Sequence, residues 1–186
     1  IISIEPNSKI NDSLISVESD WSSVSYFYSI VAMSKDSELE IGSFHEFSIQ
    51  GDIKLSEIYT KLGVTTEFLK SSSKILLKKT NNFVMPENIH LDLTENPDIA
   101  QTIAVTCFGL GVKCDLFGLH TLKIKETDRL EALKIELSKL GADVKITENS
   151  FHLSSSSSIN AAICRRTASV LPLAIRVRTP SFDIKA

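Results

Sequence analysis

Apolar residues recur along the chain with two spacings, one typical of helices and one typical of strands. Residues 13–17 and 38–41 alternate between apolar and polar positions, which predicts two strands. Between them, apolar residues at intervals of three and four predict a helix through Met33, with Asp20 as its N-cap. The chain therefore opens with a strand, a helix and a second strand.

The pattern continues with a second helix and a hairpin. Asp52 is placed to cap a helix whose end is marked by Gly63, since glycine is the residue best suited to a left-handed C-cap. Residues 64–68 and 74–77 then alternate as two strands around a serine-rich turn. The first 79 residues thus predict the order βαβαββ.

This order repeats. The sequence of residues 55–63 reappears in similar form at residues 133–141, an offset of 78 positions, and the same offset carries Asp20 onto Asp98. The second copy predicts the following elements: strand 89–93, a helix with Pro97 in its first turn, strand 113–117, helix 127–140, and strands 144–146 and 150–153.

Repetition also predicts the fold. The repeat units span about 13–79 and 89–153, and an incomplete third begins at about 159. Three such units would form one α+β domain of pseudo-threefold symmetry, with helices inside and sheets outside. Both ends of the sequence fall within predicted strands, so we expect residues 1–186 to be one globular domain of a longer protein.

Composition and charge argue against several classes of function. A net charge of -3 gives no general attraction to nucleic acid or to anionic membranes. No apolar run approaches the roughly 20 residues of a membrane span. The three cysteines and four histidines have no metal-ligand spacing, and no leader-like segment precedes them, so we expect a cytoplasmic protein without a metal site.

The densest group of charges lies at residues 123–130, in the turn before a predicted helix. Thr127 as an N-cap, with acidic neighbours in the first turn, would explain part of it. Helix capping does not explain Lys125 and Arg129, two cations at a helix start, where anions bind readily. The segment is therefore either an anion-binding site or a solvated helix cap.

Asp98 is likewise either a helix cap or part of a ligand-binding site. After Pro97 it could simply cap a helix. In a βαβαββ unit, however, the two helix starts can lie on the same side, which would bring Asp98 close to Lys125 and Glu126. A carboxylate among cations and a second carboxylate suits acid–base chemistry. The first copy keeps the capping residues and lacks the charged cluster, which favours a ligand in the second copy.

Three segments, residues 17–26, 96–102 and 125–130, resemble in order and spacing the motifs of the 5-enolpyruvylshikimate-3-phosphate synthase family. The resemblance implies the inside-out α/β barrel domain of enolpyruvyl transferases. It also implies transfer of the enolpyruvyl group from phosphoenolpyruvate to shikimate 3-phosphate, in the pathway to aromatic amino acids. The family uses no metal and no organic cofactor.

The resemblance also implies residue roles. Asp98 would bind the shikimate hydroxyls and help to move the proton of the attacking one. Glu126 would bind substrate and exchange a proton with the methylene carbon of phosphoenolpyruvate. Lys125 would hold shikimate 3-phosphate, and Arg129 would bind the phosphoenolpyruvate carboxylate. Thr121 stands where the family usually has an asparagine, and it can still donate one hydrogen bond to substrate.

Other features depart from the family. Residues 163–168 lack the family's Asp-His-Arg-Met-Ala stretch, and the resemblance extends neither to the family's N-terminal domain nor to its C-terminal lysine segment. We therefore expect a monomeric C-terminal domain that is inactive without its N-terminal partner domain. Two alternatives are a non-catalytic binding or scaffold domain of this fold and a transferase that acts on a UDP-sugar.

Overall fold

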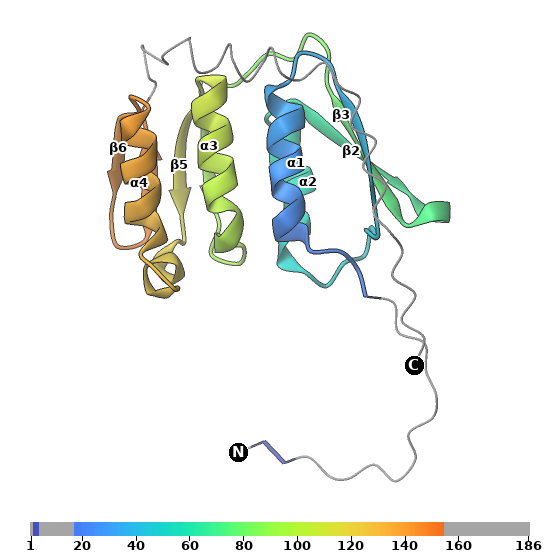
Figure 1. Ribbon diagram of the computed structural model, residues 1–186, viewed down its shortest axis with the longest axis horizontal. Coiled ribbons are helices and arrows are strands. Elements are labelled where there is room, and N and C mark those ends of the chain that lie inside the picture. The colour runs from blue at the N-terminus through green and yellow to red at the C-terminus, as the bar shows by residue number, and fades with distance from the viewer. Residues whose placement is uncertain (1, 4–16, 155–186) are drawn as a thin grey trace.

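The computed structural model describes residues 2–3 and 17–154. Residues 21–153 fold into two similar units side by side (Figure 1). The first unit contains α1 (Trp21–Met33), β1 (Glu38–Gly42), α2 (Leu55–Thr60), β2 (Val64–Leu69) and β3 (Lys74–Lys79). The second contains β4 (Asn88–Asp92), α3 (Ala100–Leu110), β5 (Lys113–Phe117), α4 (Arg129–Lys139), β6 (Val144–Ile146) and β7 (Ser150–Leu153). Short 3-10 turns precede α2, α3 and α4, at Gly51–Lys54, Pro97–Ile99 and His120–Ile124, and one joins β2 to β3 at Lys70–Ser72.

Three strands of each sheet share one topology, as the predicted repeat requires. The first sheet has the order β1-β3-β2, and the second has β4-β5-β7-β6. In each, the central strand pairs antiparallel with both neighbours, so that β1-β3-β2 corresponds to β5-β7-β6. The second sheet adds β4, which pairs parallel with β5. The predicted α+β class is confirmed for this part of the chain.

Some predicted elements lie outside the described residues. These are the third repeat unit and all of the predicted strand at 13–17 except Val17, which is not in a strand. The pseudo-threefold arrangement depends on that third unit and stays a prediction.

Helix ends follow the expected chemistry at most positions. Asp20 caps α1, where its carboxylate accepts hydrogen bonds from the backbone N–H groups of Ser22 and Ser23 at 2.9 and 3.2 Å. Gly63 and Gly141 have φ angles of 77° and 91°, left-handed values that glycine adopts without strain. Equivalent turns in the two units thus use the same residue for the same reason.

Two predicted caps are wrong. Asp52 does not cap a helix, because the chain first makes a 3-10 turn and α2 begins only at Leu55; the Asp52 carboxylate accepts a hydrogen bond from the Ser22 hydroxyl instead. Thr127 does not cap α4, which begins at Arg129 and is capped by Asp128. The predicted helix start was therefore two residues early.

The core fills the space between the helices and the sheets. Trp21 is fully buried, and its ring meets the Phe44 ring edge to face with centroids 5.0 Å apart. At the seam between the units, three buried hydroxyls bond to one another: Tyr59 to Ser29 and to Thr106 at 2.9 Å, and Thr106 to Ser29 at 2.7 Å. This network fixes α1, α2 and α3 relative to one another.

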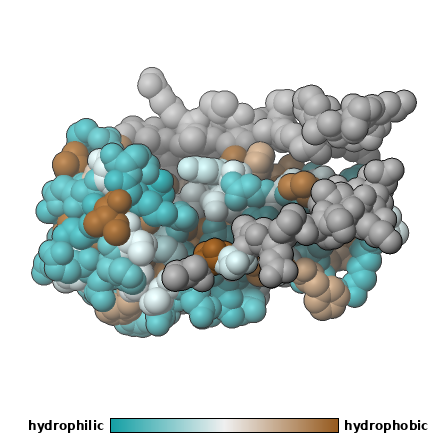
Figure 2. Space-filling model, turned by 90° about the horizontal axis from the view of Figure 1, so that it is seen from below, coloured by the Kyte–Doolittle hydropathy of each residue, from teal (hydrophilic) through white to brown (hydrophobic). Residues whose placement is uncertain are grey.

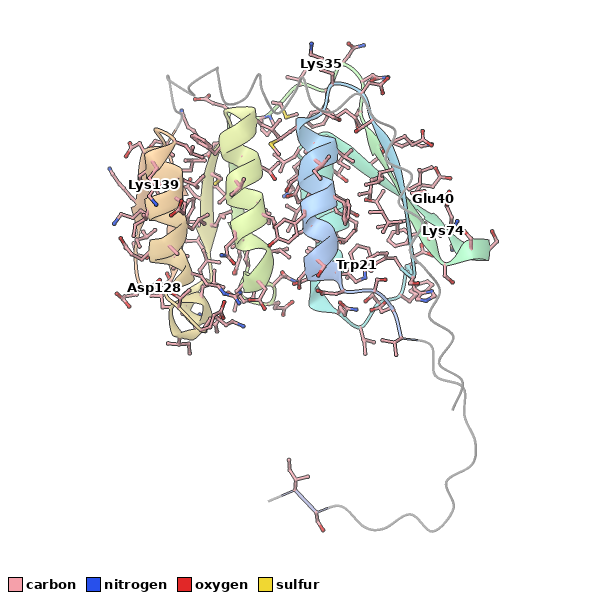
Figure 3. The ribbon with its side chains drawn as sticks, in the orientation of Figure 1. Trp21, Lys35, Glu40, Lys74, Asp128 and Lys139 are labelled. Atoms are coloured by element: carbon pink, nitrogen blue, oxygen red, sulfur yellow. The ribbon has the colours of Figure 1, made fainter. Side chains whose placement is uncertain are left out.

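Helices α1, α3 and α4 lie in one layer and begin at the same end of the molecule (Figures 1 and 3). Trp21 and Asp128 mark this end in Figure 3, and Lys35 and Lys139 mark the other. The starts of three helices, with the loops that precede them, therefore form one face.

Candidate active site

Asp98, Lys125, Glu126 and Arg129 meet at the face where the helices begin. Arg129 Nη1 donates to Asp98 Oδ1 at 3.1 Å, and Lys125 Nζ lies 3.3 Å from the same oxygen. Arg129 also contacts the Glu126 carboxylate: Nε donates to Oε1 at 3.0 Å, and Nη2 donates to Oε2 at 2.9 Å and lies 2.8 Å from Oε1. The prediction that Asp98 lies close to Lys125 and Glu126 is confirmed.

Helix capping explains neither Asp98 nor the two cations. No side chain caps α3 or the 3-10 turn before it, so the Asp98 carboxylate is engaged by cations and not by a helix start. In α4 the capping role belongs to Asp128, whose Oδ1 accepts from the N–H groups of Leu130 and Glu131 at 3.1 and 3.0 Å. The charged cluster is therefore additional to the helix cap.

Tight packing between two loops brings the cluster together. The N–H of Leu93, at the end of β4, donates to the carbonyl of Phe117, at the end of β5, at 2.9 Å. Gly118 follows with a φ of 79°, and a Cβ atom there would lie 2.4 Å from the backbone nitrogen of Thr94. Just beyond, Asn96 Nδ2 donates to the Gly51 carbonyl at 2.7 Å and ties this loop to the first unit. Asp98 is thus held by both neighbouring segments.

Asp98, Glu126 and Arg129 of this cluster form one wall of an open cleft of about 470 Å³. Its lining comes from the starts of α1, α3 and α4: Ser22, Ser23, Ser25, Tyr26, Asp98, Gln101, Thr102, Glu126, Thr127, Arg129 and Ala132. Figure 2 views this face directly, and hydrophilic residues cover most of its second-unit half, on the left. The α1 wall was not predicted, although the offset that aligns Asp20 with Asp98 was a signal for it.

One carboxylate near the cleft and one that lines it have pKa values shifted in opposite directions. Burial raises the pKa of Asp52, the hydrogen bond from Ser22 lowers it, and the negative charges of Asp98 and Asp20 raise it further. Glu126 shows the opposite shift: a hydrogen bond from its own backbone N–H and those from Arg129 hold its pKa below the ordinary value, with help from the charge of Lys125. At neutral pH, Glu126 is therefore an ionised carboxylate paired with Arg129.

Two predicted site residues lie differently from the rest. The Thr121 hydroxyl is buried, has no hydrogen-bond partner among the described residues, and is not part of the cleft lining. Lys125 contacts Asp98 from beside the cleft and does not line it.

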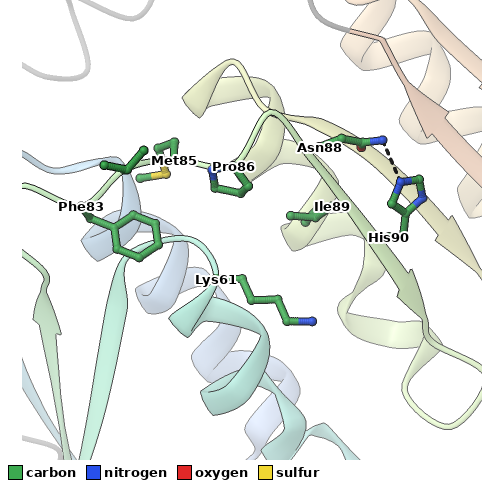
Figure 4. Close-up of a pocket in the computed structure, with 8 residues that line it drawn as sticks. Lys61, Phe83, Met85, Pro86, Asn88, Ile89 and His90 are labelled. Carbon is green, nitrogen blue, oxygen red and sulfur yellow. Dashed lines mark hydrogen bonds between the residues drawn. The ribbon is translucent and has the colours of Figure 1, made fainter.

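A second cluster of titratable side chains and a second cavity lie away from this cleft. Among the described residues, no group of three or more potential metal ligands comes together. His90 and His152 both contact Asp115 on the second sheet, at 3.0 and 2.6 Å. A second cavity, of about 530 Å³, lies at the opposite end of the helices and includes Lys61 and Phe83 (Figure 4). It contains none of the predicted site residues.

Comparison with known proteins assigns the family. The family model for EPSP synthase (3-phosphoshikimate 1-carboxyvinyltransferase) matches residues 1–170. The chain belongs to the EPSP synthase family. A 3-phosphoshikimate 1-carboxyvinyltransferase of Bacteroides fragilis is 46% identical over 125 residues, covering 67% of this chain and 30% of the relative. One of Methanococcus vannielii is 37% identical over 130 residues, covering 69% and 29%.

The fold comparison agrees with this assignment. The structure of EPSP synthase from Acinetobacter baumannii matches with a TM-score of 0.61 at 19% identity, over 75% of this chain and 32% of that one. This chain thus has the fold of part of an EPSP synthase, and its matches span about 30% of the length of the relatives named here. Within the described residues, no helix combines the length and apolar character that a membrane crossing requires.

Proposed function

We propose that this chain provides one wall of the active site of an enzyme that transfers the enolpyruvyl group from phosphoenolpyruvate to shikimate 3-phosphate, with release of phosphate. The observation that carries the proposal is the cluster of Arg129, Lys125, Asp98 and Glu126 at one end of an open cleft. Family membership supports it, because the relatives that match are 3-phosphoshikimate 1-carboxyvinyltransferases.

The residue types suit this substrate pair, which carries two phosphates and a carboxylate. Arg129 offers a planar pair of N–H donors, the arrangement that binds a carboxylate with two hydrogen bonds. Lys125 provides a point charge for shikimate 3-phosphate near the reacting hydroxyl. Asp98, between these cations, is an acceptor for the substrate hydroxyls and for the proton of the attacking one.

Proton transfer to carbon is the demanding step. Addition of the shikimate hydroxyl to phosphoenolpyruvate requires a proton at the methylene carbon, and elimination of phosphate requires its removal. Glu126 is assigned to both tasks, because its carboxylate is exposed in the cleft beside the cations that would hold the substrates. Thr121 is the weakest member of the substrate-binding set, since its hydroxyl lies outside the cleft lining.

The described wall contains too few cations for all the substrate charges. We therefore assign the remaining contacts to an N-terminal domain, consistent with a match to about 30% of the relatives' length. In this proposal residues 1–186 are a C-terminal domain that works as a monomer in the cytoplasm and is inactive alone. Catalysis follows closure of the two domains over the substrates. Addition and elimination need no redox or organic cofactor, so none is assigned.

Phosphate release tests this proposal. The chain would be assayed with both substrates, alone and after mixing with the separately produced N-terminal part of the Bacteroides fragilis relative. We expect turnover only in the mixture, and we expect Glu126→Gln to lower it by about 100-fold or more. Glu136→Gln removes a similar carboxylate, paired with Lys139 on the same helix, and should leave turnover unchanged. Equal loss in both variants, or none in either, would refute the role of Glu126.

A further inference from the structure

Arg129 holds a carboxylate of its own chain. Its Nε and Nη2 atoms donate in parallel to the two oxygens of Glu126, at 3.0 and 2.9 Å, and its Nη1 donates to Asp98. Two parallel bonds from one guanidinium edge to one carboxylate are the geometry in which arginine binds a free carboxylate ligand. The edge of Arg129 that faces Glu126 is therefore occupied by a group of the same chemistry as the substrate.

We propose that Glu126 is an internal competitor for the substrate carboxylate: the incoming carboxylate displaces Glu126 from Arg129, and this displacement frees Glu126 to take up a proton. The inference rests on the proposed function and extends it, because it makes binding of one substrate the event that prepares the catalytic acid. Arg129 acts on the proton step through Glu126 and is in that respect a positioning residue.

The geometry permits the exchange. The side chain of Glu126 is 67% exposed, whereas that of Arg129 is 23% exposed and stays anchored to Asp98. Glu126 also precedes the first residue of α4, so its side chain can turn away without breaking a helical hydrogen bond. An exposed ion pair of this kind changes an equilibrium by at most about fivefold, so a ligand carboxylate can compete with it.

The charges around Glu126 decide whether its pKa rises or falls when a ligand carboxylate binds. Arg129 and Lys125 favour its ionised form, and Asp98 shares both cations with it. Asp52 interacts through its charge with Asp98 on one side and with Asp20 on the other. When a ligand carboxylate replaces Glu126 on Arg129, Glu126 loses its nearest cation contact and gains a negative neighbour. Both changes raise its pKa, so ligand binding is accompanied by proton uptake and is stronger at lower pH.

Pyruvate is a suitable probe, because it is a carboxylate without a phosphate and stays ionised over the range tested. Its binding to the 186-residue chain would be followed by NMR at the Arg129 side chain, from pH 4 to pH 7. The Glu126 carboxyl carbon would report protonation of that residue in the same samples. The variants are Glu126→Gln and, as the matched control, Glu136→Gln, which breaks an ion pair of the same spacing with Lys139.

We expect Glu126→Gln to bind pyruvate up to about fivefold more tightly at pH 7, and Glu136→Gln to bind it as the unmodified chain does. Pyruvate should raise the pKa of Glu126, and the pH dependence of binding should be weaker in Glu126→Gln, where this carboxylate is absent. Equal affinities in all three proteins, a pKa of Glu126 that pyruvate does not change, or no binding to Glu126→Gln would each overturn the inference. If the chain turns over substrate when mixed with the N-terminal part of the relative, but pyruvate leaves the pKa of Glu126 unchanged, the proposed function stands and only this inference is removed.

Discussion

Gly118 is the position where one added methyl group should do the most damage near the site. Its φ of 79° is left-handed, and a Cβ atom would lie 2.3 Å from the Thr94 hydroxyl oxygen, 2.4 Å from its backbone nitrogen and 2.7 Å from its Cα. Backbone atoms cannot move aside as the end of a flexible side chain can. Gly118→Ala must therefore shift the loop that leads to Asp98.

Gly111 is a control for the strain alone. It has a φ of 72°, and a Cβ atom there would meet no described residue within 4 Å. Both substitutions place alanine in a left-handed conformation, at a cost of about 1 to 2 kcal/mol each. Both also restrict the unfolded chain equally, so that contribution cancels. Overlap with Thr94 adds about 1 to 3 kcal/mol for Gly118→Ala only, by analogy with overpacked cores.

Urea denaturation followed by circular dichroism would measure the difference. With a slope of about 2 kcal/mol per molar urea, the midpoint of Gly118→Ala should lie roughly 0.5 to 1.5 M below that of Gly111→Ala. Equal midpoints would show that the two loops are not packed as described, and that Asp98 is not held in place by Gly118.

Three other predictions concern the cap, the seam and the sheet. Asp128→Ala should lower the free energy of unfolding by about 1 kcal/mol, whereas Thr127→Ala, at a residue that does not cap α4, should change it little in the same urea titration. Tyr59→Phe should cost about 1 to 3 kcal/mol, because it leaves two buried hydroxyls short of a partner; an unchanged midpoint would contradict the network. The hydrogen bond from His152 lowers the pKa of Asp115, so its contribution to stability is present above about pH 4 and is lost as the pH falls through the lowered value. The stability difference from Asp115→Asn, measured in urea from pH 7 to pH 3, should shrink over that acid range, and a constant difference would refute the assignment.

Much of the fold could be predicted because the two units repeat the same local signals. Strands 113–117, 144–146 and 150–153 were predicted with the bounds that the structure shows. The errors arose at helix starts, where several polar residues compete to cap. Asp52 was predicted to cap because it precedes an apolar run, but its carboxylate accepts a hydrogen bond from Ser22, thirty positions earlier. No spacing within one segment reports such a contact.

The charged part of the site was also accessible from sequence, because Lys125 and Arg129 exceed what a helix cap requires. Two aspects were not. The α1 wall of the cleft is made of serines and a tyrosine, residue types that give no chemical signal by themselves. The pairing of Arg129 with Glu126 depends on side-chain directions in the turn before α4, which the spacing of three residues permits but does not require.

The central claim, that these residues form half of a transferase active site, is tested most directly in a chimaera. Residues 17–153 would replace the matching segment of the Bacteroides fragilis relative, which is 46% identical to this chain over 125 residues. Phosphate release from phosphoenolpyruvate and shikimate 3-phosphate would then be measured for the chimaera and for its Glu126→Gln variant. The account predicts turnover by the chimaera and a loss of about 100-fold or more in the variant. A folded chimaera without turnover, or a variant as active as its parent, would contradict it.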